Sequence, residues 1–447
     1  MSRIRIIITI IVVVLTTLLT GCTGKEPNEI AYVVALGIDS TDDDNYKITI
    51  QYANTTQISG GASESGGKAG SEIVDNVTIE APNIYAGVGL ANNIVSKSFS
   101  MSHAKLIVFS KEIAEKGVKD MIETLVRSEE IRPDVFIAVA NTTANDYLTS
   151  VNPEMEVNPA QYYQLIYQKN QLVGIPDGQL REFFTGLYTD NYDSILPVAG
   201  VIEGAGGNSQ NDDKGQSKDS QNEGSEGSSE SLDSFERKNS EKKEKEKDAK
   251  KNTSKYEYDI KNYVGGETAI EKKNKAEAIG AAVFEKDKMV GELGEVETEI
   301  CKMLKGDYTY SYLTYYNNDT PDIPITVKTT QQKKPKYKID TDKKTVDIEL
   351  YIESDLYSLP ADYNVENKIE DFERDVANYT SSACTEFINN FTKKYNSDIL
   401  KLNEKVKYKF LTNNQYNWFK KNVGWSEYKF SVCTNFKVRR TGLIVRE

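Results

Sequence analysis

A low-complexity segment near the middle of the chain limits what this sequence can fold into. Residues 204–255 begin with Gly, Ser, Asn and Asp and continue as Lys-Glu repeats over 236–251. Almost the only residues that a core could bury there are Leu232, Phe235 and Ala249. Because so little burial cannot offset the entropy of ordering, we predict a disordered linker, in which Lys-Glu pairs allow a transient helix.

The linker divides the chain of 447 residues into two predicted folded regions, residues 22–203 and 256–447. The N-terminal residues 1–21 stand apart from both. Arg3 and Arg5 precede an apolar run of about fourteen residues, which is shorter than the roughly twenty that span a bilayer. This length is typical of a signal peptide, and no later stretch is long and apolar enough to predict a membrane span.

The leader ends in Leu19-Thr20-Gly21-Cys22, which resembles the lipobox of bacterial lipoproteins. The resemblance implies cleavage between Gly21 and Cys22, an S-linked diacylglycerol on Cys22 and an optional N-acyl group. A thiol is the nucleophile that such a thioether needs, and two acyl chains suffice for stable anchoring. The alternative is an ordinary signal peptide with an unrelated cysteine.

Charge and residue counts exclude several functions. The net charge is −13, and near −15 once Arg3 and Arg5 are removed, which argues against nucleic acid and against electrostatic binding to anionic lipid. His103 is the sole histidine, and no G-x-S-x-G motif is present. We therefore predict no catalytic residues, no metal site and no cofactor.

Three cysteines follow the lipobox, at positions 301, 384 and 433, with spacings that match no metal pattern. We predict that all three are buried apolar residues, with one disulfide as the alternative.

The first region alternates strands and helices. Buried strands are predicted at 104–109 and 134–140, on either side of a helix at 111–127. This order implies a right-handed crossover between parallel strands, which need cover on both faces. The other predicted elements are a hairpin of 28–39 and 46–53, a strand at 73–80, a helix at 83–96 and mainly helical structure over 145–187. Exposed aromatic residues in the last stretch would form a partner surface, or else they cover a small helical subdomain.

The second region mixes strand runs with one long helix, which indicates an α+β fold. The predicted elements are a hairpin of 276–285 and 289–293, a helix at 295–304, a meander of strands at 308–316, 323–329, 336–340 and 345–353, a helix at 365–395, a strand at 405–410, a helix at 414–423 and strands at 429–438 and 442–445. The apolar stripe of the helix at 365–395 is predicted to pack across the meander. The whole chain is therefore predicted to be multi-domain, with mixed sheets packed by helices.

Several blocks, in order, resemble one family, the Ger(x)C lipoproteins, which are the C subunits of spore germinant receptors. The blocks are Glu29-Ile30 leading to Val34-Ala35-Leu36-Gly37-Ile38-Asp39, Ser96-Lys97 through Ser102-His103-Ala104-Lys105 to Ile107-Val108-Phe109-Ser110, then Arg127, Glu130, Arg132 and Pro133, then Ala278–Phe284 with Gly291 to Glu299, and finally Trp418 and Gly442-Leu443. The resemblance covers nearly the whole chain after Cys22, except the linker.

The resemblance implies a non-catalytic lipoprotein on the outer face of the spore inner membrane. It implies two integral membrane subunits, A and B, as partners in a complex that senses nutrients and leads to ion and dipicolinate release. Direct binding of a small molecule by this subunit stays open.

Ser102, His103 and Lys105 precede a buried strand and are possible partner contacts; alternatively, Ser102 caps a turn and His103 makes a local hydrogen bond. A rival interpretation is a solute-binding lipoprotein of an ABC-type importer, which would need two lobes of repeated strand-helix units around a cleft. A lipid-anchored enzyme is a third and weaker alternative.

Overall fold

The structure is a computed structural model. It describes residues 3–9, 29–43, 45–53, 74–152, 156, 158–168, 174–189, 191–202, 262–268, 274–316, 324–358, 368–395 and 397–441. Gly21, Cys22, the predicted linker at 204–255 and the predicted strand at 442–445 lie outside these residues.

The first sheet has nine strands in the order β3-β2-β1-β5-β6-β7-β8-β9, with β4 paired to β1. Its centre is parallel, since β1, β5, β6 and β7 run in one direction, and its outer strands are antiparallel. The predicted hairpin and crossover are therefore confirmed. The strands are β1 (Ile30–Ser40), β2 (Tyr46–Ala53), β3 (Val74–Ala81), β4 (Ser98–Ser100), β5 (Leu106–Ser110), β6 (Phe136–Ala140), β7 (Ile195–Val201), β8 (Ala276–Glu285) and β9 (Lys288–Leu293).

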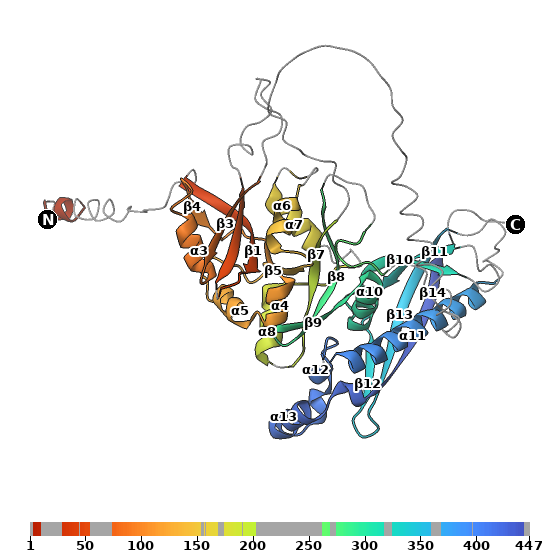
Figure 1. Ribbon diagram of the computed structural model, residues 1–447. Coiled ribbons are helices and arrows are strands. Elements are labelled where there is room, and N and C mark those ends of the chain that lie inside the picture. Colours follow the sequence, from red (N-terminus) through yellow and green to blue (C-terminus); the bar gives the residue numbers. More distant parts are fainter. Residues whose placement is uncertain are drawn as a thin grey trace, which may run out of the picture.

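Helices cover both faces of this sheet, as the fully buried β5 and β6 require (Figure 1). One face packs against α3 (Ile84–Ala91), α4 (Lys111–Lys116), α5 (Lys119–Val126) and α8 (Leu180–Thr189). The other packs against α6 (Ala144–Ser150) and α7 (Pro159–Gln168). Most tyrosines of the 145–187 stretch lie in this second layer, where Tyr147, Tyr163 and Tyr167 are buried, so they cover the sheet rather than form a partner surface.

The predicted single helix at 111–127 is two helices, α4 and α5. The break is at Gly117, which has φ 125°, a conformation that residues with a Cβ rarely adopt. Beside it, the Val118 amide donates to the Asp287 carbonyl (3.0 Å) in the β8–β9 turn. The break between α4 and α5 therefore allows a hydrogen bond between this helix layer and the β8–β9 hairpin, which lies about 170 residues further along the chain.

The second sheet has five strands. Its longest strand, β13, pairs in parallel with β14 along its length and in antiparallel with both β11 and β12. β12 pairs with Thr345–Glu349 of β13, and β11 pairs with Ile352–Ser358 of the same strand. β11 and β12 therefore lie end to end along the edge of β13 opposite β14. In a simple meander these two strands would instead pair with each other. The strands are β10 (Tyr310–Tyr316), β11 (Pro324–Gln331), β12 (Lys336–Asp340), β13 (Thr345–Ser358) and β14 (Lys429–Arg440).

The long helix α11 (Ile369–Lys394) lies across this sheet, as predicted (Figure 1). α10 (Glu295–Lys305) and α13 (Asn413–Asn422) are also confirmed. The predicted strand at 405–410 is wrong, because this segment forms α12 (Leu402–Val406) and a 3-10 helix (Lys407–Lys409).

The prediction that all three cysteines are buried is wrong for Cys433. Cys301 and Cys384 are buried free thiols, whereas Cys433 is exposed. In β14 the even-numbered residues from Phe430 to Phe436 face the core, so Cys433 falls on the opposite face.

The α+β class with mixed sheets is confirmed, but the two regions share a boundary element. β8 and β9 follow the linker in sequence, yet β8 pairs with β7 and completes the first sheet. Side chains of β8 point into both cores: Ala282 and Phe284 pack with the first region, and Ala281 and Val283 with the second.

Gly117 offers a test of the break between α4 and α5. Gly117→Ala is expected to destabilise the protein by roughly 1–3 kcal/mol, because it places a Cβ at positive φ and 2.7 Å from the Asp287 carboxylate. The matched control is Gly89→Ala in α3, where nothing lies within 4 Å of the added Cβ. This control is expected to stabilise by roughly 0.5–1 kcal/mol. Urea unfolding measures both, and an equal effect of the two substitutions contradicts the assignment.

Candidate functional site

The predicted contact residues lie together at the start of β5. The Ser102 hydroxyl is 3.0 Å from Nδ1 of His103, and the exposed His103 ring packs edge-on against Tyr32 of β1, with centroids 4.8 Å apart. The backbone of Lys105 links β1 to β6, since its amide donates to the Val34 carbonyl (2.9 Å) and its carbonyl accepts from Phe136 (3.0 Å). The local hydrogen bond expected of His103 is therefore present, and the ring still reaches solvent.

A glutamate from another block of the sequence holds this turn. The carboxylate of Glu130 accepts from the Met101 amide at 2.7 Å. Nearby, the guanidinium of Arg132 donates twice to the Asp134 carboxylate, at 3.0 and 3.2 Å. Two blocks that are separate in the sequence therefore form one surface feature. Within the described residues no hydrogen bond joins Nε2 of His103 to a carboxylate, so the Ser102–His103 pair lacks the third member of a catalytic triad.

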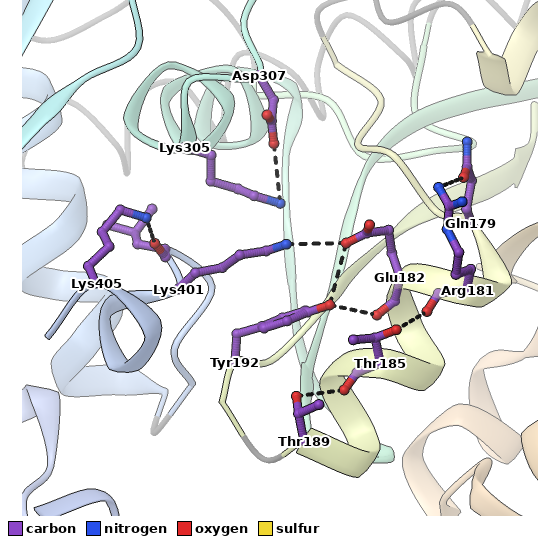
Figure 2. A network of polar contacts seen from close by, with 11 residues as sticks. Gln179, Arg181, Glu182, Thr185, Thr189, Tyr192, Lys305, Asp307, Lys401 and Lys405 are labelled. Atoms are coloured by element: carbon purple, nitrogen blue, oxygen red, sulfur yellow. Dashed lines mark hydrogen bonds and ion pairs between the residues drawn. The ribbon is translucent and has the colours of Figure 1, made fainter. Parts of the chain in front are cut away.

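A second polar site, which the sequence did not indicate, joins the two regions. Here α8 and the loop before β7 meet the segment that leads into α12 (Figure 2). Nζ of Lys401 lies 3.2 Å from Oε2 of Glu182 and 4.1 Å from the centroid of the Tyr192 ring. The Tyr192 hydroxyl donates to the Glu182 carbonyl at 3.1 Å. We call Glu182, Tyr192, Asp193, Asp398 and Lys401 the junction cluster.

Two aspartates of the junction cluster bind each other's backbone. The Asp398 amide donates to the Asp193 carboxylate (2.8 Å), and the Asp193 amide donates to the Asp398 carbonyl (3.2 Å). The Asp193 carboxylate also accepts from the Lys286 amide (2.8 Å) in the β8–β9 turn. The Asp398 carboxylate accepts from the amides of Leu402 and Asn403, both at 2.8 Å, and so satisfies the first two backbone donors of α12.

Burial controls the protonation of this cluster. Asp398 is 6% exposed, and desolvation raises its pKa to about 7 despite the two backbone hydrogen bonds, which act in the opposite direction. Desolvation also lowers the pKa of Lys405, whose ammonium donates to the Leu400 carbonyl at 2.7 Å. The junction therefore contains a carboxyl that changes charge near neutral pH.

Two cavities flank the junction cluster. One of about 550 Å³ is lined by Tyr395, Asn417, Lys420 and Trp425, and one of about 360 Å³ by Asp177 and Lys305. Tyr192 and Asp193 border both. Among the described residues, no group of three or more His, Cys, Asp or Glu is placed to hold a metal ion. The cluster can thus orient polar groups, and its Asp398 carboxyl can titrate.

The junction cluster could not be found from sequence patterns. Its contacts join residues 205 and 219 positions apart, and no local periodicity encodes such pairs. The available signal is Asp398 placed shortly before a helical turn, which is typical of a cap.

Comparisons with known proteins identify the family. A family described as "Spore germination protein N-terminal domain" matches residues 24–201, and one described as "Spore germination B3/ GerAC like, C-terminal" matches residues 279–442. Together the two matches cover most of the chain. The chain belongs to the GerAC-like family of spore germination proteins, which confirms the resemblance to Ger(x)C proteins.

Individual relatives are distant. Spore germination protein KC of Bacillus subtilis (strain 168) is 26% identical over 176 residues, which are 36% of this chain and 43% of that protein. Spore germination protein B3 of the same organism is 26% identical over 148 residues, 31% of this chain and 36% of the relative. The matched stretches thus span less than half of these relatives. The crystal structure of the GerBC protein superposes with a TM-score of 0.48 at 15% identity, over 90% of this chain and 96% of that one.

The predicted lipid-attachment residue Cys22 lies outside the described residues, as does Gly21. Residues 3–9 are helical. No helix in the described part of the chain is both long and apolar enough to cross a membrane.

Asp398 predicts an unusual pH dependence of stability. Its pKa is raised from 3.8 to about 7 on folding, so the folded state binds the extra proton and stability falls as pH rises through this window. Asp398→Asn removes the titration, and from pH 4 to pH 8 the variant is expected to gain stability relative to wild type by up to about 4 kcal/mol.

The matched control is Asp347→Asn, which makes the same change of side chain at an exposed position of β13, outside the junction cluster. Urea unfolding at a series of pH values measures all three proteins. If the free energies of unfolding of wild type and Asp398→Asn changed with pH in parallel, the Asp398 carboxyl would be ionised over the whole pH range, and the prediction would be wrong.

Proposed function

We propose that this protein is the lipid-anchored, non-catalytic C subunit of a nutrient germinant receptor. In this proposal Cys22 carries the lipid on the outer face of the spore inner membrane, and the two folded regions work beside the integral membrane subunits A and B. The observation that carries the proposal is the pair of family matches, one in each region and in the family's order. Signal peptide 1–21, region 22–203, linker 204–255 and region 256–447 are the proposed parts.

The lipid anchor is supported by chemistry and charge. Leu19-Thr20-Gly21-Cys22 follows an apolar run of signal-peptide length. A chain with net charge −13 has little electrostatic attraction to anionic lipid, so attachment needs a covalent group. Restriction to a membrane then raises the effective concentration of partner surfaces.

The geometry supports a contact role for the Ser102 turn. Cys22 precedes Glu29, where the described body begins, by seven positions, which is a reach of at most about 25 Å. Ile30 and Tyr32 pair with β4, directly before the turn, and Tyr32 touches His103. Ser102, His103 and Lys105 are therefore at the end of the sheet nearest to the proposed anchor, where membrane subunits are within reach.

The importer interpretation receives less support. A solute-binding protein needs two similar lobes of strand-helix units, whereas the second region is a largely antiparallel sheet crossed by one long helix. A pull-down of the tagged protein from spore inner membranes in mild detergent distinguishes the two. Two multi-pass germination subunits are expected, and an importer permease with its ATPase would favour the rival.

Loss of the anchor is the first genetic test. Cys22→Ala is expected to release the protein from the membrane fraction and to lower the germination rate by at least tenfold in spores that lack every other receptor. Mass spectrometry of the wild-type N-terminal peptide is expected to show a diacylglyceryl group on Cys22. Cys433→Ala, at an exposed free cysteine, is the control and should leave both readouts unchanged. A normal response from unanchored protein would reject the proposal.

The contact surface has its own test. The double variant His103→Ala, Lys105→Ala is expected to reduce recovery of the A and B subunits in the pull-down at least threefold, with normal membrane attachment. Lys116→Ala is the control, because Lys116 is an exposed residue at the end of α4. Undiminished recovery with the double variant would place the partner interface elsewhere.

A further inference from the structure

A small cavity in the second region lies apart from the junction cluster. It lies between α10, β10 and α11 and has a volume of about 110 Å³. Its apolar walls come from all three elements and include Val296, Ile300 and Met303 of α10, Leu313 of β10 and Ala383 of α11. An apolar protein cavity of about 150 Å³ is large enough for benzene, which has six non-hydrogen atoms, so this smaller cavity suits a ligand of about four.

Two carboxylic acids border this apolar space. Glu295 and Glu299 lie four residues apart, hence on one face of α10, and both line the cavity. Glu299 accepts a hydrogen bond from the Tyr308 hydroxyl at 3.2 Å, and burial raises its pKa to about 7. None of the described residues that line the cavity is basic. The nearby Lys302 ammonium is directed away, since it donates to the Ile175 carbonyl at 3.0 Å.

Aromatic rings complete the lining. Tyr312 of β10 and Tyr379 of α11 both border the cavity, and the Tyr312 side chain is 53% exposed. Tyrosine faces attract ammonium groups, and a carboxylate beside such a ring adds the attraction of opposite charges. Acidic groups, aromatic rings and apolar walls therefore meet in one space.

From this combination we infer that the cavity binds a small organic cation, a primary alkylammonium with a short chain. The ammonium pairs with Glu299 and Glu295, and the chain occupies the apolar space between α10 and α11. The charge of the lining selects against anions and zwitterions, because a carboxylate on the ligand would face two carboxylates. A hydrated metal ion is disfavoured because the walls around the acids are apolar and offer few further oxygen ligands. This inference does not rest on the receptor role.

The test is isothermal titration of the full-length chain in mild detergent with n-propylamine, and with n-propanol as the neutral ligand of the same shape. The titration is run at pH 8.5, above the pKa of about 7 of Glu299 and below the value of about 10.4 typical of an alkylamine. Propylamine is expected to bind at least tenfold more tightly than propanol. Equal affinities would reject the assignment of a cation site.

Two variants locate the binding. Glu299→Gln is expected to weaken the binding of propylamine at least tenfold, with little effect on the binding of propanol. Ala383→Met fills the space from α11 and is expected to abolish both, while leaving the two acids in place. The control Glu386→Gln, at an exposed position on α11, makes the same charge change outside the cavity and is expected to bind as wild type. Saturation transfer from protein to the methylene protons of propylamine gives a second readout. Persistence of that transfer in Ala383→Met would overturn the proposal even if Glu299→Gln failed to fold.

Discussion

The pairing of β8 with β7 is the constraint on which the arrangement of the two regions depends. β8 is hydrogen-bonded into the first sheet, and Val283 and Ala281 on its other face belong to the second core. A strand with both faces buried cannot shift register by one residue without exchanging its two sets of side chains. The register Ile195 to Val283 therefore fixes where the second region begins relative to the first.

Polar contacts reinforce this apolar joint at one end. Asp193 lies in the loop before β7, and its carboxylate accepts hydrogen bonds from both the β8–β9 turn and the Asp398 amide. Because the Asp398 amide donates to the Asp193 carboxylate and the Asp193 amide donates to the Asp398 carbonyl, the loop cannot move without exposing buried polar groups, which is costly. The first sheet and the segment before α12 are thus held together at this end, and they share a carboxyl, Asp398, whose pKa burial raises to about 7.

Sequence patterns correctly predicted those helices and strands whose own apolar residues form a continuous run or recur at a regular spacing. β5 and β6 are continuous apolar runs, and α11 carries its buried residues at helical spacing, so each could be assigned from its own residues. The errors arose where a distant contact decides the structure. Gly117 breaks a periodic helix because its backbone must meet the β8–β9 turn. The segment 405–410 alternates like a strand, but it begins with the last residues of α12, where Val406 is buried in the second core.

The same distinction separates the sites. Cys22 and the Ser102 turn could be proposed from short motifs, whereas the junction cluster and the α10 cavity are assembled from residues far apart in the sequence. The cavity lies next to the contact between the two folded regions. α10 begins directly after β9 and contacts β8, the strand that joins the two cores. A cation held between α10 and α11 would favour whichever arrangement of these helices fits it best, by no more than its difference in affinity between arrangements. A tenfold difference corresponds to about 1.4 kcal/mol, so a ligand of a few atoms can shift a balanced equilibrium at this joint but cannot reverse a strongly biased one.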